Sequence, residues 1–186
     1  MPNWCSNQLF VEGEKKQLDA FLEFIKGYDD EGMSIHFSFE SIDKTPPELL
    51  AMPSPVSHVE QDKNAIEAEN VKKYNAKDWY EWRKNHWGTK WNLDKNAYTK
   101  RYSSKKWAIS FDTAWTPPIP IIERLAEKFP DLKMELKYCE PSLCFAGVFK
   151  AYKGALIDDA YNDGLGVDKK KYEKLAIEFG FREWLE

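Results

Sequence analysis

The sequence lacks several features that would assign it to a well-defined class of protein. It contains no run of about 18 apolar residues, so we expect no membrane-spanning helix. No charged segment followed by an apolar stretch opens the chain, so no secretory signal is expected. Its three histidines, His36, His58 and His86, are far apart, and no pair has the spacing of a zinc site. We therefore expect no metal, no other cofactor, no contact with a membrane and a cytoplasmic location.

Signatures of catalysis are scarce as well. We find no G-x-S-x-G motif, phosphate-binding loop or dinucleotide-binding fingerprint. The three cysteines, Cys5, Cys139 and Cys144, come without a secretory signal and are interpreted as reduced thiols. The sequence allows a Cys5–His86–Asp112 set at one end of a sheet, but nothing in it requires one. Binding is therefore favoured over catalysis, and an enzyme is the competing class.

Aromatic residues, by contrast, are abundant. Eight Trp, nine Tyr and eleven Phe make up 15% of the 186 residues, and many of these rings are needed for a core. The length suits one domain, or one domain with a large insertion. Because the net charge is only −4, the chain as a whole has no electrostatic attraction to nucleic acid or to anionic membranes.

Hydrophobic periodicity predicts two β-α-β halves. Apolar residues alternate in the strands and recur at i, i+3, i+4 and i+7 in the helices. The first half consists of strands at 7–11 and 34–39 around a helix at 14–26. The second half consists of strands at 107–113 and 132–138 around a helix that begins at Pro117-Pro118, where proline is tolerated.

Two such halves in one antiparallel sheet predict an α+β, ferredoxin-like fold with helices on one face and strand order 4-1-3-2. We expect a single domain over 1–186, with its core in 1–40 and 106–158. An extra hairpin turns at Lys153-Gly154, and a C-terminal helix at about 168–180 is expected to be capped by Asp168.

Residues 41–105 are predicted to form a large aromatic, helical insertion between the two halves. Four prolines crowd residues 46–55 and indicate a loop. A helical composition follows over 64–85, in two pieces, and Asp78 with Glu81 is typical of a capping box at the second piece. Gly88 is expected to end that helix.

Tryptophan stands beside small polar residues in three stretches, "PNWCSN", "HWGTKW" and "FDTAW". In the predicted topology the first strand begins beside the end of the third, so the first and last stretches should meet; the middle one is assigned to the same end because its character is alike. The candidate binding residues are Asn3, Trp4, Asn7, Trp87, Thr89, Lys90, Trp91, Asp112, Thr113 and Trp115.

Three interpretations of this cluster remain open. The first is a second small core in which the polar side chains satisfy buried indoles and strand ends. The second is a binding site for a small polar ligand or a macromolecule. The third is a nucleic-acid surface on the open face of the sheet, which the third strand does not favour because Trp107, Ile109 and Phe111 share the helix-covered face. The basic stretch "KRYSSKKW" at 100–107 favours it.

The motifs "NWCSNQLFVEG", "WGTKWNLD" and "FDTAWTPP", in this order, resemble the YubB-type ferredoxin-like family of uncharacterised, plasmid- and phage-borne Api-like proteins. The resemblance covers roughly residues 1–150, and the tail after about 158 is interpreted as an addition of this protein. It implies a ferredoxin-like fold and no catalytic residue. We therefore expect a mobile-element accessory protein, in the cytoplasm of a bacterial host, that binds an unidentified host or phage protein.

Overall fold

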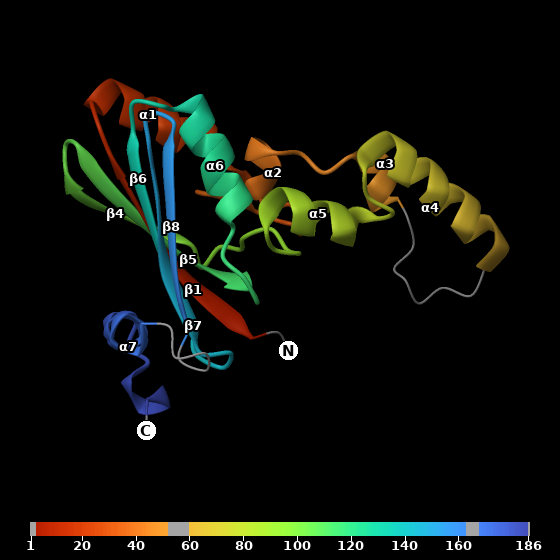
Figure 1. Cartoon of the computed structure of the whole chain (residues 1–186). Coiled ribbons are helices and arrows are strands. Elements are labelled where there is room, and N and C mark those ends of the chain that lie inside the picture. Colours follow the sequence, from red (N-terminus) through yellow and green to blue (C-terminus); the bar gives the residue numbers. More distant parts are fainter. Residues whose placement is uncertain (1–2, 52–59, 163–167, 186) are drawn as a thin grey trace.

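A six-stranded antiparallel sheet forms the centre of the computed structural model, which describes residues 3–51, 60–162 and 168–185 (Figure 1). Its strand order is β4-β5-β1-β6-β7-β8. Strand β1 alternates buried and partly exposed side chains, as a strand with one covered face must. The strands are β1 (Trp4–Glu12), β4 (Tyr98–Ser103), β5 (Lys106–Ala114), β6 (Lys133–Glu140), β7 (Phe145–Tyr152) and β8 (Ala155–Asn162).

The first four strands in this order have the ferredoxin-like arrangement that the sequence predicts. Strand β1 is central and pairs antiparallel with β5, so that Trp4 lies opposite Ala114 and Val11 opposite Trp107. The opposite edge of β1 pairs with β6. The predicted order of the fourth, first and third strands and the predicted juxtaposition of the start of the first strand with the end of the third are therefore confirmed.

The prediction of the second strand is wrong. Residues 34–39 do not join the sheet: β3 (Ser34–Ile35) pairs only with β2 (Gly27–Tyr28) in a separate small sheet. The apolar alternation of this segment arises because Phe37 and Phe39 are both buried in the core. The Phe37 ring packs edge-on against that of Phe111, with the ring centres 5.1 Å apart. The second place in the sheet goes to β4, which comes from the segment predicted as insertion. A tight turn joins β4 to β5, and so short a loop costs little closure entropy.

Two helices cover one face of the sheet, and a third lies on the other face (Figure 1). Buried side chains of α1 (Lys15–Phe24) and α6 (Ile119–Lys128) share a core with Leu9, Ile109 and Leu136 of the sheet. Helix α7 (Lys169–Glu178) packs with Tyr172 and Ala176 on Cys139 and Ala146. Asp168 stands before α7 as predicted, but its side chain makes no capping hydrogen bond.

The predicted insertion supplies β4 to the sheet and also packs through α5 (Trp79–Trp87) against α6. Its other helices are α2 (Phe39–Ile42), α3 (Pro47–Leu50) and α4 (Glu60–Tyr74). Elsewhere, a short helix, η1 (Arg182–Trp184), follows α7. Prolines 53 and 55 of the predicted loop lie outside the described residues. Asp78 caps α5 as predicted, since the Glu81 amide donates to its carboxylate at 2.8 Å, but the Glu81 carboxylate accepts from the Lys77 amide instead of completing the predicted capping box. Trp82 and Trp87 of α5 belong to the same core as the sheet.

At the far edge, β7 and β8 form the predicted hairpin. Lys153 and Gly154 have φ values of 49° and 80°, the left-handed backbone that a two-residue hairpin turn requires. Across the described residues, no helix is both long and apolar enough to cross a membrane.

Candidate binding surface

The ten predicted residues divide into a buried group and an exposed group. Asn7, Thr89, Thr113 and Trp87 are at most 2% exposed, whereas Trp4 is 47% and Trp115 37% exposed. The two groups are layers of one structure, because the buried residues hold the strand ends and loops that carry the exposed rings. The second-core interpretation therefore describes the buried part of the cluster, and the exposed rings lie outside that core.

Hydrogen bonds join the buried group to the backbone. The Asn7 amide nitrogen donates to the Cys5 carbonyl at 2.7 Å and to the Thr113 hydroxyl at 2.8 Å, which ties β1 to β5. The Thr89 hydroxyl donates to the Ala114 carbonyl at 3.0 Å. The Trp87 indole donates to the Asp43 carbonyl at 2.9 Å, as a buried indole requires. These four residues are structural.

Three tryptophans and one lysine form the exposed layer, which we call the tryptophan surface: Trp4, Lys90, Trp91 and Trp115. The Lys90 ammonium lies 3.9 Å from the centre of the Trp91 ring and 4.1 Å from that of Trp115, so it is held between two indoles. Trp4 extends the surface, with its ring 5.9 Å from that of Trp91. Cation–π contacts of this kind stabilise the lysine without removing its charge.

The backbone of Trp115 is strained. Its φ is 70°, in the left-handed region that a bulky side chain rarely adopts. Two hydrogen bonds hold the turn: the Trp115 amide donates to the Asn3 carbonyl at 2.9 Å, and the Thr116 hydroxyl donates to the Gly88 carbonyl at 2.5 Å. The strained geometry brings an exposed ring against Lys90 instead of burying it. Such strain is often found at functional sites.

Gly88 positions the loop that carries Lys90 and Trp91. It ends α5 with a φ of 79°, as the sequence predicts. A Cβ at this position would lie 2.9 Å from the Pro117 carbonyl oxygen, so the loop packs directly on the segment before α6. Only glycine fits here on both counts.

Asn3 and Asp112 lie apart from the rings. Asn3 contributes its backbone carbonyl to the Trp115 turn. The Asp112 carboxylate accepts a hydrogen bond from the Ser6 hydroxyl at 2.7 Å, on the face of the sheet opposite α1 and α6. There Asp112 lines a cavity of about 310 Å³ together with Ser6, Ser110 and Glu178.

The Cys5–His86–Asp112 set has other partners in the structure. Cys5 is fully buried, and burial raises the pKa of its thiol well above the usual value, which opposes formation of a nucleophilic thiolate. The His86 ring stacks on Trp82 at 3.9 Å, and its Nδ1 lies 2.8 Å from an Asp43 carboxylate oxygen. In the part of the chain that the structure describes, no group of His, Cys, Asp and Glu side chains is arranged to hold a metal.

Arg83 is an organising residue that the sequence reasoning missed. It is 5% exposed, and its guanidinium donates to Asp30 and to Glu40, both at 2.9 Å, while lying 4.4 Å from the Trp87 ring centre. Nothing in the local pattern distinguishes it, because a charged residue on an amphipathic helix is usually solvated. Its partners are more than 40 residues away in the sequence.

Comparisons with known proteins identify the fold. A family model described as "Ferredoxin-like domain in Api92-like protein" matches residues 86–180. The crystal structure of a protein Api92 from Yersinia pseudotuberculosis aligns with a TM-score of 0.54 and 12% identity, over 87% of this chain and 98% of that chain. No curated protein matches the chain. The family model extends to 180, so β8 and α7 are part of the family domain, and the prediction that the tail after 158 is an addition is wrong.

Proposed function

We propose that this chain, which belongs to the Api92-like family of ferredoxin-like proteins, is a binding protein whose tryptophan surface docks onto another protein. The observation that carries the proposal is the cation held between two partly exposed indoles, with a third indole beside them. A buried core gains little from leaving such rings in water. A protein interface gains binding energy by covering such rings, because Trp is among the residues most enriched in interface hot spots.

Charge and shape support a protein as the partner. The Lys90 ammonium favours an opposing carboxylate, while the indoles offer apolar area to the side chains around it. Two cavities lie on the sheet among the described residues: the one beside Asp112, and a second one between Phe10 and Tyr152. Neither is lined by Trp4, Trp91 or Trp115. An open ring surface suits a macromolecule better than it suits a small polar ligand, which favours a concave site.

We also propose a narrower family and a biological setting for this protein. The sequence motifs support a YubB-type protein carried by a phage or plasmid, acting in the cytoplasm of a bacterial host on a host or phage protein. The Yersinia origin of the solved relative is consistent with a bacterial setting.

Quantitative capture from a bacterial lysate, followed by reconstitution with the purified partner, tests the proposal. Trp91→Ala and Lys90→Ala each truncate the centre of the tryptophan surface. We expect either change to weaken binding of the purified partner, by about 30-fold for the tryptophan, which is the lower limit for a hot-spot residue. Tyr28→Ala is the matched control, because Tyr28 is an exposed aromatic residue on the separate small sheet.

The proposal also requires that the variants stay folded. Because Trp91 is only partly buried, the denaturant midpoint of Trp91→Ala should remain close to that of the wild type. A partner that binds Trp91→Ala as tightly as the wild type would contradict the proposal.

A further inference from the structure

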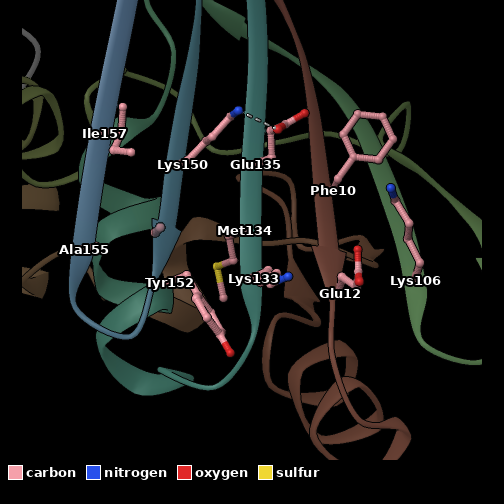
Figure 2. A pocket seen from close by; sticks show the side chains of 11 residues that line it. Phe10, Glu12, Lys106, Lys133, Met134, Glu135, Lys150, Tyr152, Ala155 and Ile157 are labelled. Atoms are coloured by element: carbon pink, nitrogen blue, oxygen red, sulfur yellow. Dashed lines mark ion pairs between the residues drawn. The ribbon is translucent and has the colours of Figure 1, made fainter.

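A second surface, separate from the tryptophan surface, crosses the face of the sheet opposite α1 and α6. Aromatic rings and lysines form a row across its strands, with Glu12 and Glu135 beside them, and Figure 2 shows Phe10, Lys106, Lys133 and Tyr152 of this row. We call this row the lysine–aromatic row; its members are Tyr102 and Lys100 from β4, Lys106 from β5, Phe10 from β1, Lys133 from β6 and Tyr152 from β7. Helix α7 leaves the row uncovered, because it packs on Cys139 and Ala146.

Cations and rings are in direct contact along the row. The Phe10 ring lies 6.1 Å from that of Tyr102, and the Lys106 ammonium lies 5.3 Å from the Phe10 ring centre. The Lys100 ammonium is 5.1 Å from the Tyr102 ring, and that of Lys133 is 5.5 Å from the Tyr152 ring. Each exposed ring therefore has an ammonium group beside it.

The sheet is hollowed along this row. A cavity of about 340 Å³ lies between Phe10, Lys106, Lys133, Tyr152 and Ile157, over the backbone of β6 and β7. In Figure 2, Phe10 and Lys106 stand on one side of the hollow and Tyr152 and Ile157 on the other. Flat rings beside a shallow hollow leave room for a planar group to stack.

The charges of the row are only partly neutralised. Lys150 pairs with Glu135 at 3.3 Å and Lys137 with Glu178 at 2.5 Å, which occupies both of these acids. Among the described residues, Lys100, Lys106 and Lys133 have no ion pair at 4.0 Å or less. Glu12 is the remaining carboxylate beside them, opposite Lys106 and Lys133 in the strand register. Lys100, Lys106 and Lys133 against Glu12 leave the row itself cationic, although the whole chain carries −4.

We propose that the lysine–aromatic row binds single-stranded nucleic acid. Proteins that bind single strands combine stacking rings for the bases with a cationic track for the phosphates, and sequence preference is weak because every base has a π-face. The row crosses five strands, from β4 to β7, and four spacings of about 4.8 Å give a path of about 19 Å, which accommodates a few nucleotides. A duplex offers no free bases to such rings.

From the sequence, nucleic-acid binding is disfavoured because the large side chains of the third strand are expected on the helix-covered face. That strand indeed presents Ala108 and Ser110 to the face that carries the row, opposite Phe10 and Gln8 of β1. The rings come from its neighbours: Phe10 from β1 and Tyr102 from β4, whose place in the sheet the sequence did not predict. Part of the basic stretch at 100–107 thereby becomes a row of side chains on one face.

Fluorescence anisotropy with labelled 20-nucleotide oligo(dT) and oligo(U) at low salt tests this inference. We expect both to bind, and a 20-base-pair duplex to bind at least tenfold more weakly. Tyr102→Ala should weaken binding by roughly 5- to 100-fold, the effect of removing the ring on which one base stacks. Lys100→Glu should weaken it too and lower the slope of log K against log salt by about 0.7, because one phosphate of the strand is then no longer neutralised.

Matched controls separate this surface from the rest of the molecule. Lys16→Glu makes the same charge change on α1, and Tyr28→Ala removes an exposed ring outside the row; both should bind like the wild type. Because Tyr102 and Lys100 are exposed, the test variants should also keep the wild-type thermal midpoint. Failure of the wild type to bind either oligomer, equal binding of the duplex, or an equal loss in Lys16→Glu and Lys100→Glu would overturn the inference. Trp91→Ala should bind the oligomers normally, which separates the result from that of the proposed protein partner.

Discussion

At the residue scale, exposure distinguishes tryptophans that look alike in the sequence. Trp87 and Trp91 are four residues apart, the spacing that puts two side chains on one helix face. Because Gly88 ends the helix between them, Trp87 is buried in the core while Trp91 lies at the surface. The sequence shows the glycine but not the direction in which the chain continues. It could therefore group these residues, but it could not sort them into buried and exposed residues.

Truncation of two tryptophans should therefore have unequal effects on stability. Trp87→Ala removes a fully buried ring and should lower the free energy of unfolding by about 3–5 kcal/mol. Trp4→Ala removes a ring that is 47% exposed and should cost less than about 1 kcal/mol. Urea denaturation monitored by circular dichroism measures both. Equal losses would show that Trp4 is a core residue.

The thiols give a second prediction at this scale. Burial raises the pKa of Cys139 to about 12 and that of Cys5 well above its usual value, whereas Cys144 is only partly buried. A thiol reagent at pH 8 should label Cys144 in the native protein and all three cysteines after unfolding. Rapid labelling of Cys5 in the native state would contradict this.

The same pKa shifts set a direction for stability. Above about pH 9 the unfolded thiols lose their protons while the buried thiols keep theirs, so the unfolded state binds fewer protons and stability falls as the pH rises. The urea midpoint should therefore be lower at pH 10 than at pH 8, and a Cys5→Ala, Cys139→Ala double variant should show a smaller decrease.

At the scale of elements, short-range signals were predictable and long-range partners were not. The alternation of β5, the Asp78 cap of α5 and the Lys153-Gly154 turn depend on neighbours within a few residues, and these were correct, whereas β1 begins at Trp4, three residues before its predicted start. The second place in the sheet was assigned to residues 34–39, whereas β4 occupies it as the partner of β5. Alternation reports burial on one side, and Ile35, Phe37 and Phe39 are all buried although only Ser34 and Ile35 lie in a strand and Phe39 begins α2.

Arg83 is expected to attach α5 to the segments around it. Arg83→Ala leaves Glu40 without its partner and should lower the free energy of unfolding by about 3 kcal/mol. Arg83→Lys should recover only part of this loss, because an ammonium group cannot reproduce the contacts of a planar guanidinium with two carboxylates. Lys84→Ala, the change of an exposed neighbour, should shift the urea midpoint little. A wild-type midpoint for Arg83→Ala would contradict the assigned role.

At the scale of the whole molecule, the insertion and the sheet share one core. Trp82 and Trp87 of α5 pack in the same cluster as Leu9 and Ile109 of the sheet. Residues 46–105 expressed alone should therefore lack a cooperative thermal melt in circular dichroism, because their tryptophans would have no wall to pack against. A cooperative melt of this fragment would show that the insertion is an independent domain.

The central claim is that the tryptophan surface contacts another protein, and site-specific photocrosslinking tests it most directly. Benzoylphenylalanine is placed at Trp91 and, as a control, at Tyr28, and bacterial cells expressing each variant are irradiated. We predict a discrete crosslinked product from position 91 that carries a second protein and is absent from position 28. No crosslink from position 91, or the same products from both positions, would contradict the account.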